Sequence, residues 1–262
     1  MSLRISQSGH AARCAAVFLA VFLACGPARA ADRKPVIVPC PLSSRSLLKE
    51  TGLPRTAAKL QNAQGLKIVA LGSSTTEGTG ATRSNLSYPS LLQTHLRRAY
   101  PKQSVTVLNK GVGGETAQQM EARLDRDVLA HQPDLVLWQT GTNDAIRSVP
   151  HEQMTGALDR GLKRLRALDI DVLLIGPQHS LPLEHRIANY QSYVESMRRF
   201  AGGHQVAFLD RHQAMLRWNA QARPRTLLAS DNLHLNDDGY RCLGKAVADA
   251  ILCMSGGRCP EQ

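Results

Sequence analysis

The sequence is poor in aromatic residues and contains neither internal repeats nor low-complexity segments. Aromatic residues make up 4% of its 262 positions, whereas apolar residues as a class make up 43%. A core of this composition must be built mainly from leucine, valine, isoleucine and alanine. The length favours one large domain, or one domain with an extension.

Two binding patterns are also missing. No Gly-Lys-Ser/Thr follows Gly113 and Gly114, which argues against a phosphate-binding loop. The formal net charge is +11, but the basic residues are not interleaved with aromatic ones, so nucleic-acid binding is not expected. Most basic residues fall on predicted helices at surface spacing, which favours solvated faces over attraction to an acidic envelope polymer or anionic lipid. No cofactor or metal is expected.

Residues 1–30 resemble a cleavable signal peptide. Arg4 and Arg13 are followed by an apolar run at 15–24 and by a small-x-small cleavage motif that ends at Ala30. The run is too short for a stable membrane anchor. Lipid attachment at Cys25 is the less favoured alternative. We therefore expect export to the periplasm or secretion.

The cysteines agree with an oxidising compartment. Four remain after residue 30, an even number, and histidines do not flank them at zinc-ligand spacing. Three pairings are possible. The favoured one joins Cys253 to Cys259 across a Ser-Gly-Gly turn and Cys40 to Cys242.

Strand and helix patterns alternate from residue 66 onward. Strands are predicted at 66–71, 105–109, 135–139, 172–175 and 206–209, and helices at 88–99, 117–129, 153–168, 186–200 and 237–252. This alternation predicts a parallel sheet with helices on both faces. We expect a proline-rich extension at 31–64 that wraps on the surface with a short helix near 57–61, a main domain at 65–255 and a tail at 256–262.

Four short blocks place polar or glycine residues where strands end or helices begin. They are Gly72-Ser73-Ser74-Thr75-Thr76, Asn109-Lys110-Gly111-Val112-Gly113-Gly114-Glu115-Thr116, Gly141-Thr142-Asn143-Asp144 and Asp231-Asn232-Leu233-His234. Taken singly, each block is more often a turn or a helix cap. Together they fall at the carboxyl edge of the predicted sheet, where open α/β folds bind ligands.

The ordered set resembles the SGNH, or GDSL-type, hydrolase family over roughly residues 66–252. The resemblance implies a three-layer α/β/α sandwich with a five-stranded parallel sheet of flavodoxin-like type. It also implies roles residue by residue: Ser74 as nucleophile, His234 as base, Asp231 as its orienting partner, and Gly114 and Asn143 as oxyanion donors beside the Ser74 amide. The first block departs from the family pattern, because Ser73 stands where Asp is usual and Thr75 where Leu is usual.

The chemistry requires these residue types independently of the resemblance. A serine hydroxyl is a weak nucleophile until a base takes its proton, and a carboxylate stabilises the resulting imidazolium. Fixed N–H donors stabilise the oxyanion that forms on attack. Arg147, which follows the third block, is a candidate substrate contact.

Together, these observations predict an exported serine esterase that acts on small acyl esters. The favoured substrates are acetyl groups on envelope carbohydrate. Two alternatives remain. The stretch 109–124 also resembles bacterial periplasmic thioesterase/lysophospholipases, and a non-catalytic binding or assembly protein could share the fold. The expected partner is a small-molecule or carbohydrate ester, and the sequence does not indicate an oligomeric state.

Overall fold

The computed structural model describes residues 40–48, 52–222, 226–257 and 259. The signal peptide expected at 1–30 lies outside these residues, as does Cys25. The described residues belong to one compact unit, which comprises residues 37–262. None of the helices in the described part of the chain is both long and apolar enough to cross a membrane.

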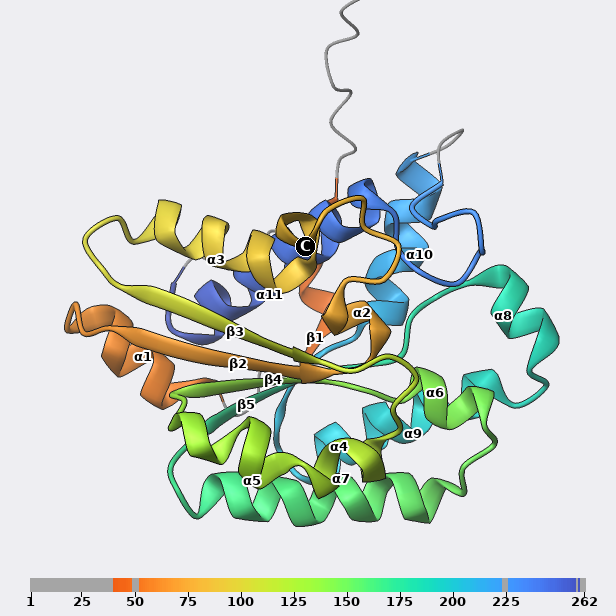
Figure 1. Cartoon of the computed structure of the whole chain (residues 1–262), viewed down its shortest axis with the longest axis horizontal. Helices are drawn as coiled ribbons and strands as arrows, with labels where there is room; N and C mark the ends of the chain where they lie inside the picture. Colours follow the sequence, from red (N-terminus) through yellow and green to blue (C-terminus); the bar gives the residue numbers. More distant parts are fainter. Residues whose placement is uncertain (1–39, 49–51, 223–225, 258, 260–262) are drawn as a thin grey trace, which may run out of the picture. The chain divides into compact units, whose positions relative to one another are not determined.

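A mixed sheet forms the middle layer of the described fold (Figure 1). Its parallel strands are β2 (Leu66–Gly72), β3 (Val105–Gly111), β4 (Leu135–Gln139), β5 (Asp171–Ile175) and β6 (Ala207–Leu209). The strand order is β1-β6-β5-β4-β2-β3, in which β1 (Leu47–Leu48) pairs antiparallel with β6. The order of the five parallel strands is that of flavodoxin-like proteins, so the predicted fold class is confirmed.

The side chains of each strand alternate between two hydrophobic cores. In β4, Leu135 and Leu137 contribute to one core, whereas Val136 and Trp138 contribute to the other. Both faces are therefore buried, which explains why the strands read as continuous apolar runs. The first core is covered by α1 (Pro54–Gln61), α3 (Tyr88–Ala99), α10 (Arg211–Ala222) and α11 (Asp237–Met254).

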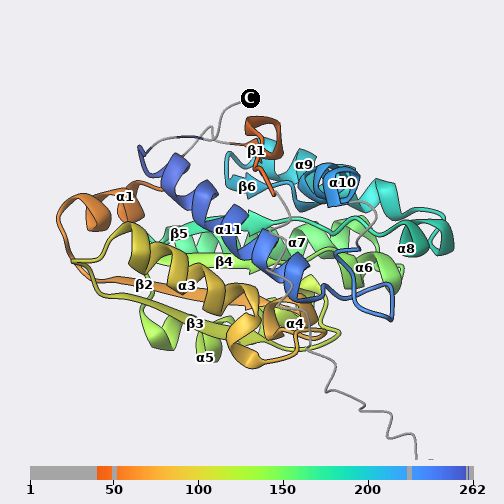
Figure 2. The ribbon, with the colours of Figure 1, turned by 90° about the horizontal axis from the view of Figure 1, so that it is seen from above.

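The second core lies under helices on the opposite face (Figures 1 and 2). These are α4 (Ala117–Ala122), α5 (Leu124–Asp127), α7 (His151–Arg166) and α9 (Tyr190–Gly203), with the shorter α6 (Thr142–Ile146) and α8 (Leu181–Arg186) beside them. Short elements fill several connections: α2 (Ser74–Glu77) and the 3₁₀ turns η1 (Ser44–Ser46), η2 (Ser84–Leu86) and η3 (Leu129–His131).

Two predicted helices differ from the structure. The helix expected at 117–129 is interrupted at Arg123, whose buried side chain turns inward to donate hydrogen bonds to the carbonyl oxygens of Gly72 and Lys110. The helix expected at 186–200 instead covers Tyr190–Gly203 and is preceded by α8. The sequence analysis did not predict α10, because its buried face begins with polar residues rather than with an apolar repeat.

The N-terminal extension is not merely wrapped on the surface, and that expectation was wrong. Leu42, Leu53 and Leu60 are buried in the first core, and β1 completes the sheet edge beside β6. The indole of Trp218 donates a hydrogen bond to the carbonyl oxygen of Pro41 at 3.1 Å. The described residues of this stretch, 40–48 and 52–64, are therefore an integral part of the unit.

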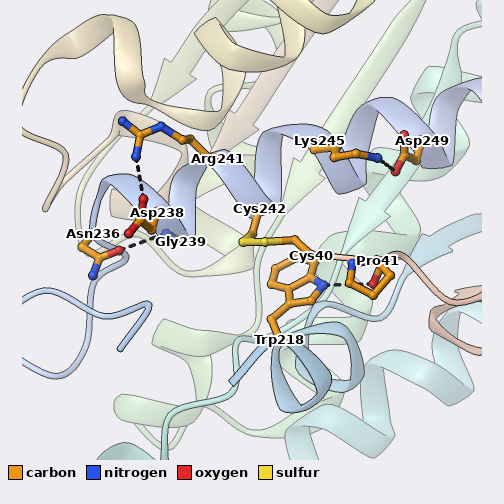
Figure 3. The surroundings of a disulfide bond; sticks show 10 residues. All are labelled: Cys40, Pro41, Trp218, Asn236, Asp238, Gly239, Arg241, Cys242, Lys245 and Asp249. Carbon is orange, nitrogen blue, oxygen red and sulfur yellow. Dashed lines mark hydrogen bonds and ion pairs between the residues drawn. A yellow bond between two sulfur atoms is a disulfide. The ribbon is translucent and has the colours of Figure 1, made fainter. Parts of the chain in front are cut away.

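The favoured cysteine pairing is present. One disulfide joins Cys40 to Cys242 on α11, beside Trp218, as Figure 3 shows. The other joins Cys253, in the last turn of the same helix, to Cys259 beyond its end. The first closes a loop of 202 residues and the second a loop of 6. Both bonds agree with the expected oxidising compartment.

Mass spectrometry of the unreduced mature protein should find no free thiol. Replacing Cys40 and Cys242 together by serine should lower the free energy of unfolding by about 2–5 kcal/mol, because the long loop is no longer closed in the unfolded chain. The matched double replacement of Cys253 and Cys259 by serine should lower the free energy of unfolding by a smaller amount. Urea denaturation of both variants would measure the two free energies. Free Cys40 and Cys242 in the native protein would contradict the pairing.

Candidate active site

Ser74 is the first residue of α2, and only Ser73 separates it from the end of β2. A Cβ on Gly72 would come 2.0 Å from the Thr76 hydroxyl, so only glycine fits this turn. The neighbouring Ser73 is buried, and both its amide and its hydroxyl donate to Oε1 of Gln139, at 3.1 and 3.2 Å. The two serines therefore have different surroundings: Ser73 is held inward, and Ser74 faces the cleft.

A hydrogen-bond chain links Ser74 to His234 and Asp231. The distance from Ser74 Oγ to His234 Nε2 is 3.0 Å, and that from His234 Nδ1 to Asp231 Oδ2 is 2.6 Å. The other Asp231 oxygen accepts from the amides of Leu233 and His234. Desolvation alone would raise the pKa of Asp231, but these bonds outweigh it and lower the pKa to about 2. An ionised Asp231 only accepts, so Nδ1 carries the proton and Nε2 is free to accept from Ser74.

The expected oxyanion donors surround the same cleft, whose volume is about 400 Å³. Gly114 has a φ of +76°, which turns its backbone in a way that most residues avoid. Neither the Ser74 amide nor the Gly114 amide donates a hydrogen bond within the described part of the chain. Asn143 donates one amide hydrogen to the carbonyl oxygen of Glu115 at 2.9 Å, which leaves its second N–H available.

Arg147 lies at the margin of this cleft. Its side chain is exposed and its guanidinium donates to Gln119 at 3.4 Å. A Cβ on Gly114 would stand 3.2 Å from Arg147 Nη2, so the cation adjoins the expected oxyanion site. The structure thus brings Ser74, Gly114, Asn143, Arg147 and His234 to one cleft, with Asp231 behind the histidine.

Arg211 is a functional candidate that the sequence analysis missed. It is the second residue after β6 and is fully buried beneath the site. Its guanidinium donates to the Thr75 hydroxyl at 3.1 Å, the Thr142 hydroxyl at 3.2 Å and the Gly176 carbonyl oxygen at 3.0 Å. Among the described residues it has no carboxylate partner. Desolvation lowers the pKa of Arg211 to about 10, so it remains a cation at neutral pH.

Its three acceptors connect the blocks that carry the site. Thr75 follows the expected nucleophile, and Thr142 precedes Asn143. One planar cation therefore fixes the spacing between two expected oxyanion donors. The sequence did contain a signal, because three polar residues, Asp210-Arg211-His212, directly follow the last buried strand.

Other buried polar groups hold the remaining parts in place. Asp144 accepts from the amide of Ala117 at 3.1 Å and so joins the residue after the second block to the third block. Desolvation raises the pKa of this carboxyl. Gln178 donates to the Leu233 carbonyl oxygen at 2.6 Å, and Ser180 donates to that of Asn232 at 2.8 Å. These last two bonds anchor the loop that carries His234.

Comparison with known proteins places this chain in a family. A model described as the non-GDSL lipase-like family matches residues 39–256. The chain belongs to this family. The description fits the first block, which has Ser73 where GDSL-type proteins usually have Asp.

Individual relatives are esterases or lipolytic proteins. The chain is 32% identical over 109 residues to an arylesterase from Vibrio mimicus, covering 42% of this chain and 53% of that protein. It is 40% identical over 52 residues to an acetylxylan esterase from Geobacillus stearothermophilus, covering 20% of this chain and 24% of that protein. These matches therefore span about half or less of the curated relatives.

Solved structures resemble the fold over a longer stretch. A lipolytic protein of the G-D-S-L family from Desulfitobacterium hafniense aligns with a TM-score of 0.58 and 26% identity. The alignment covers 71% of this chain and 99% of that one. The expected resemblance to SGNH/GDSL-type hydrolases is thereby confirmed.

Arg211→Lys should slow the reaction of Ser74 with a fluorophosphonate probe by roughly 10- to 100-fold while the protein stays folded. A lysine keeps the charge but cannot bond both threonines and Gly176 at once, so the two donors lose their fixed spacing. Labelling rates and the melting temperature would be measured together, with Arg217→Lys on the same helix as control. Labelling within about twofold of the unaltered protein would show that Arg211 does not position the site.

Proposed function

We propose that this protein is an exported serine esterase that hydrolyses small acyl esters, with acetyl groups on envelope carbohydrate as the favoured substrates. The observation that supports this most is the hydrogen-bond chain from Ser74 through His234 to Asp231. It opens on a cleft that also holds Gly114 and Asn143. The arylesterase and acetylxylan esterase relatives support the same reaction class.

The reaction begins when Ser74 Oγ attacks the ester carbonyl carbon and its proton passes to His234 Nε2. The carbonyl π electrons move to oxygen, where the amides of Ser74 and Gly114 and the side chain of Asn143 stabilise the negative charge. Asp231 stabilises the imidazolium without taking its proton. The carbon–oxygen bond to the alcohol then breaks, and the alcohol leaves with the proton from His234.

Deacylation follows the same path with water as the nucleophile. Water gives a proton to His234 as it attacks the acyl-Ser74 carbonyl carbon, and Ser74 Oγ recovers that proton when it departs. The products are a carboxylic acid and the free enzyme. Arg147, at the margin of the cleft, is placed to contact the acyl or the alcohol part of the substrate.

The size of the cleft favours short acyl groups. Its lining consists mostly of small or polar residues, and only Ile146 and Leu233 contribute large apolar side chains. The connection between β4 and α7 contains α6, and the connection between β5 and α9 contains α8. The second candidate, a lysophospholipase or thioesterase, draws its support from Ile146, which is 40% exposed.

Two proposed properties rest on other parts of the chain. Export is supported by the two disulfides, which are typical of oxidising compartments. Carbohydrate as the acyl acceptor is supported by the acetylxylan esterase relative. A polysaccharide deacetylation assay with the purified mature protein tests the acceptor.

Ser74→Ala should lower kcat for p-nitrophenyl acetate by at least about 10³-fold and abolish fluorophosphonate labelling, because the nucleophile and its base act as a unit. Ser73→Ala is the matched control. Its hydroxyl donates to Gln139 rather than facing the cleft, so its loss should be far smaller. Equal losses for the two variants would show that Ser74 is not the nucleophile. If the unaltered protein did not react with the fluorophosphonate, a non-catalytic role would be favoured.

The acyl-chain preference separates the two enzymatic candidates. For p-nitrophenyl esters, kcat/KM should be highest at about two to four acyl carbons and fall about tenfold or more by eight. A deep apolar pocket would gain about 0.8 kcal/mol for each buried methylene and would produce the opposite trend. A steady rise from acetate to octanoate would establish the lysophospholipase or thioesterase alternative instead.

A further inference from the structure

Two histidines and a glutamate meet outside the catalytic chain. His179 lies in the connection after β5, Glu184 on α8 and His212 near the start of α10. One glutamate oxygen, Oε1, is 2.6 Å from His179 Nδ1 and 3.1 Å from His212 Nε2. Both imidazole side chains are 5% exposed and the glutamate side chain is 21% exposed. The ligand atoms all lie within 4.8 Å of one another.

These three groups have the donor set of a metal site. Two imidazole nitrogens and a carboxylate oxygen form a ligand combination that suits Zn²⁺ and leaves a fourth position for water. Metal–ligand bonds of 2.0–2.1 Å in a tetrahedron separate the ligand atoms by about 3.3 Å. Small side-chain movements would widen the two present separations to that value.

The surroundings leave the cluster open to a cation. Within the described residues, Glu184 forms no ion pair with a lysine or an arginine. Its Oε1 accepts a hydrogen bond from the Ser180 amide at 3.1 Å and meets the two histidines. His212 Nδ1, the ring nitrogen that does not meet Glu184, is buried without a hydrogen-bond partner among the described residues. An ion bound at Nε2 would leave this second nitrogen unchanged. The case for the ion therefore rests on the donor set, its burial and its geometry.

We propose that His179, Glu184 and His212 bind one divalent transition-metal ion, Zn²⁺, beside the catalytic centre, with water as the fourth ligand. Each histidine is the sequence neighbour of residues that position the proposed active site. His179 lies between Gln178 and Ser180, which hold the loop of His234. His212 follows Arg211. The ion would join α8 to α10 and restrain both supports, and it takes no part in the ester reaction.

The test is a Zn²⁺ titration of the tag-free mature protein by calorimetry, after treatment with EDTA and dialysis. We expect one Zn²⁺ per chain and a higher melting temperature with the ion bound, because the ion binds only the folded site. Replacing Zn²⁺ by Co²⁺ should give the intense visible absorption of a four-coordinate ion. A protein that binds neither ion would overturn the proposal and leave a hydrogen-bonded His–Glu–His cluster.

Variants show whether the ion occupies this cluster. Glu184→Gln and His212→Gln should each weaken Zn²⁺ binding by at least about tenfold, the loss that even an outer-shell partner can cause. His185→Ala, at an exposed neighbouring position on α8, should bind as the unaltered protein does. His234→Ala should also retain binding, whereas loss there would place the ion at the catalytic histidine. Undiminished binding by both ligand variants would refute the proposal.

Discussion

The structure depends on a buried cation at the carboxyl edge of its sheet. A guanidinium removed from water without a carboxylate partner is costly, and Arg211 offsets this cost only by donating to three protein oxygens. Those oxygens belong to segments that follow β2, β4 and β5. The hydrogen bonds of Arg211 can all form only when the three strand ends lie in their native positions. Folding with this charge buried therefore requires the native geometry at this end of the sheet.

A second buried arginine acts on the neighbouring strands under different electrostatic conditions. Arg123 donates to the carbonyl oxygens of Gly72 and Lys110, but it is also paired with Glu115 at 2.7 Å and Asp127 at 3.0 Å. Hydrogen bonding from Arg126 and Arg123 lowers the pKa of Asp127 to about 2 despite desolvation. Arg123 is thus neutralised locally, whereas Arg211 is not. The uncompensated charge lies below the proposed oxyanion donors, where a fixed positive field favours the developing anion.

Apolar strands and buried charges differ in how far the sequence could predict them. Strand positions were predictable because both faces of the sheet are apolar, and β4 occupies the predicted range 135–139. The strand-end blocks were predictable because polar residues and glycines follow apolar runs. Short helices such as α6 and α8 could not be predicted from periodicity, because they complete too few turns to repeat a pattern. Arg211 was missed because a buried charge contradicts the expectation that arginines are solvated. Its hydrogen-bond partners are distant in sequence and become neighbours only through the fold.

The proposed base and the proposed nucleophile are positioned in different ways. Ser74 and Asn143 follow central strands, but His234 lies on a connection between α10 and α11. That connection is restrained by an isolated bridge between Leu228 and Leu235 and by the side chains of Gln178 and Ser180. Backbone hydrogen bonds from Ala229 to His234 and from Asn236 to Leu227 add to these restraints. The proposed base therefore keeps its reach to the serine through the hydrogen bonds of a loop, whereas the sheet itself positions the nucleophile.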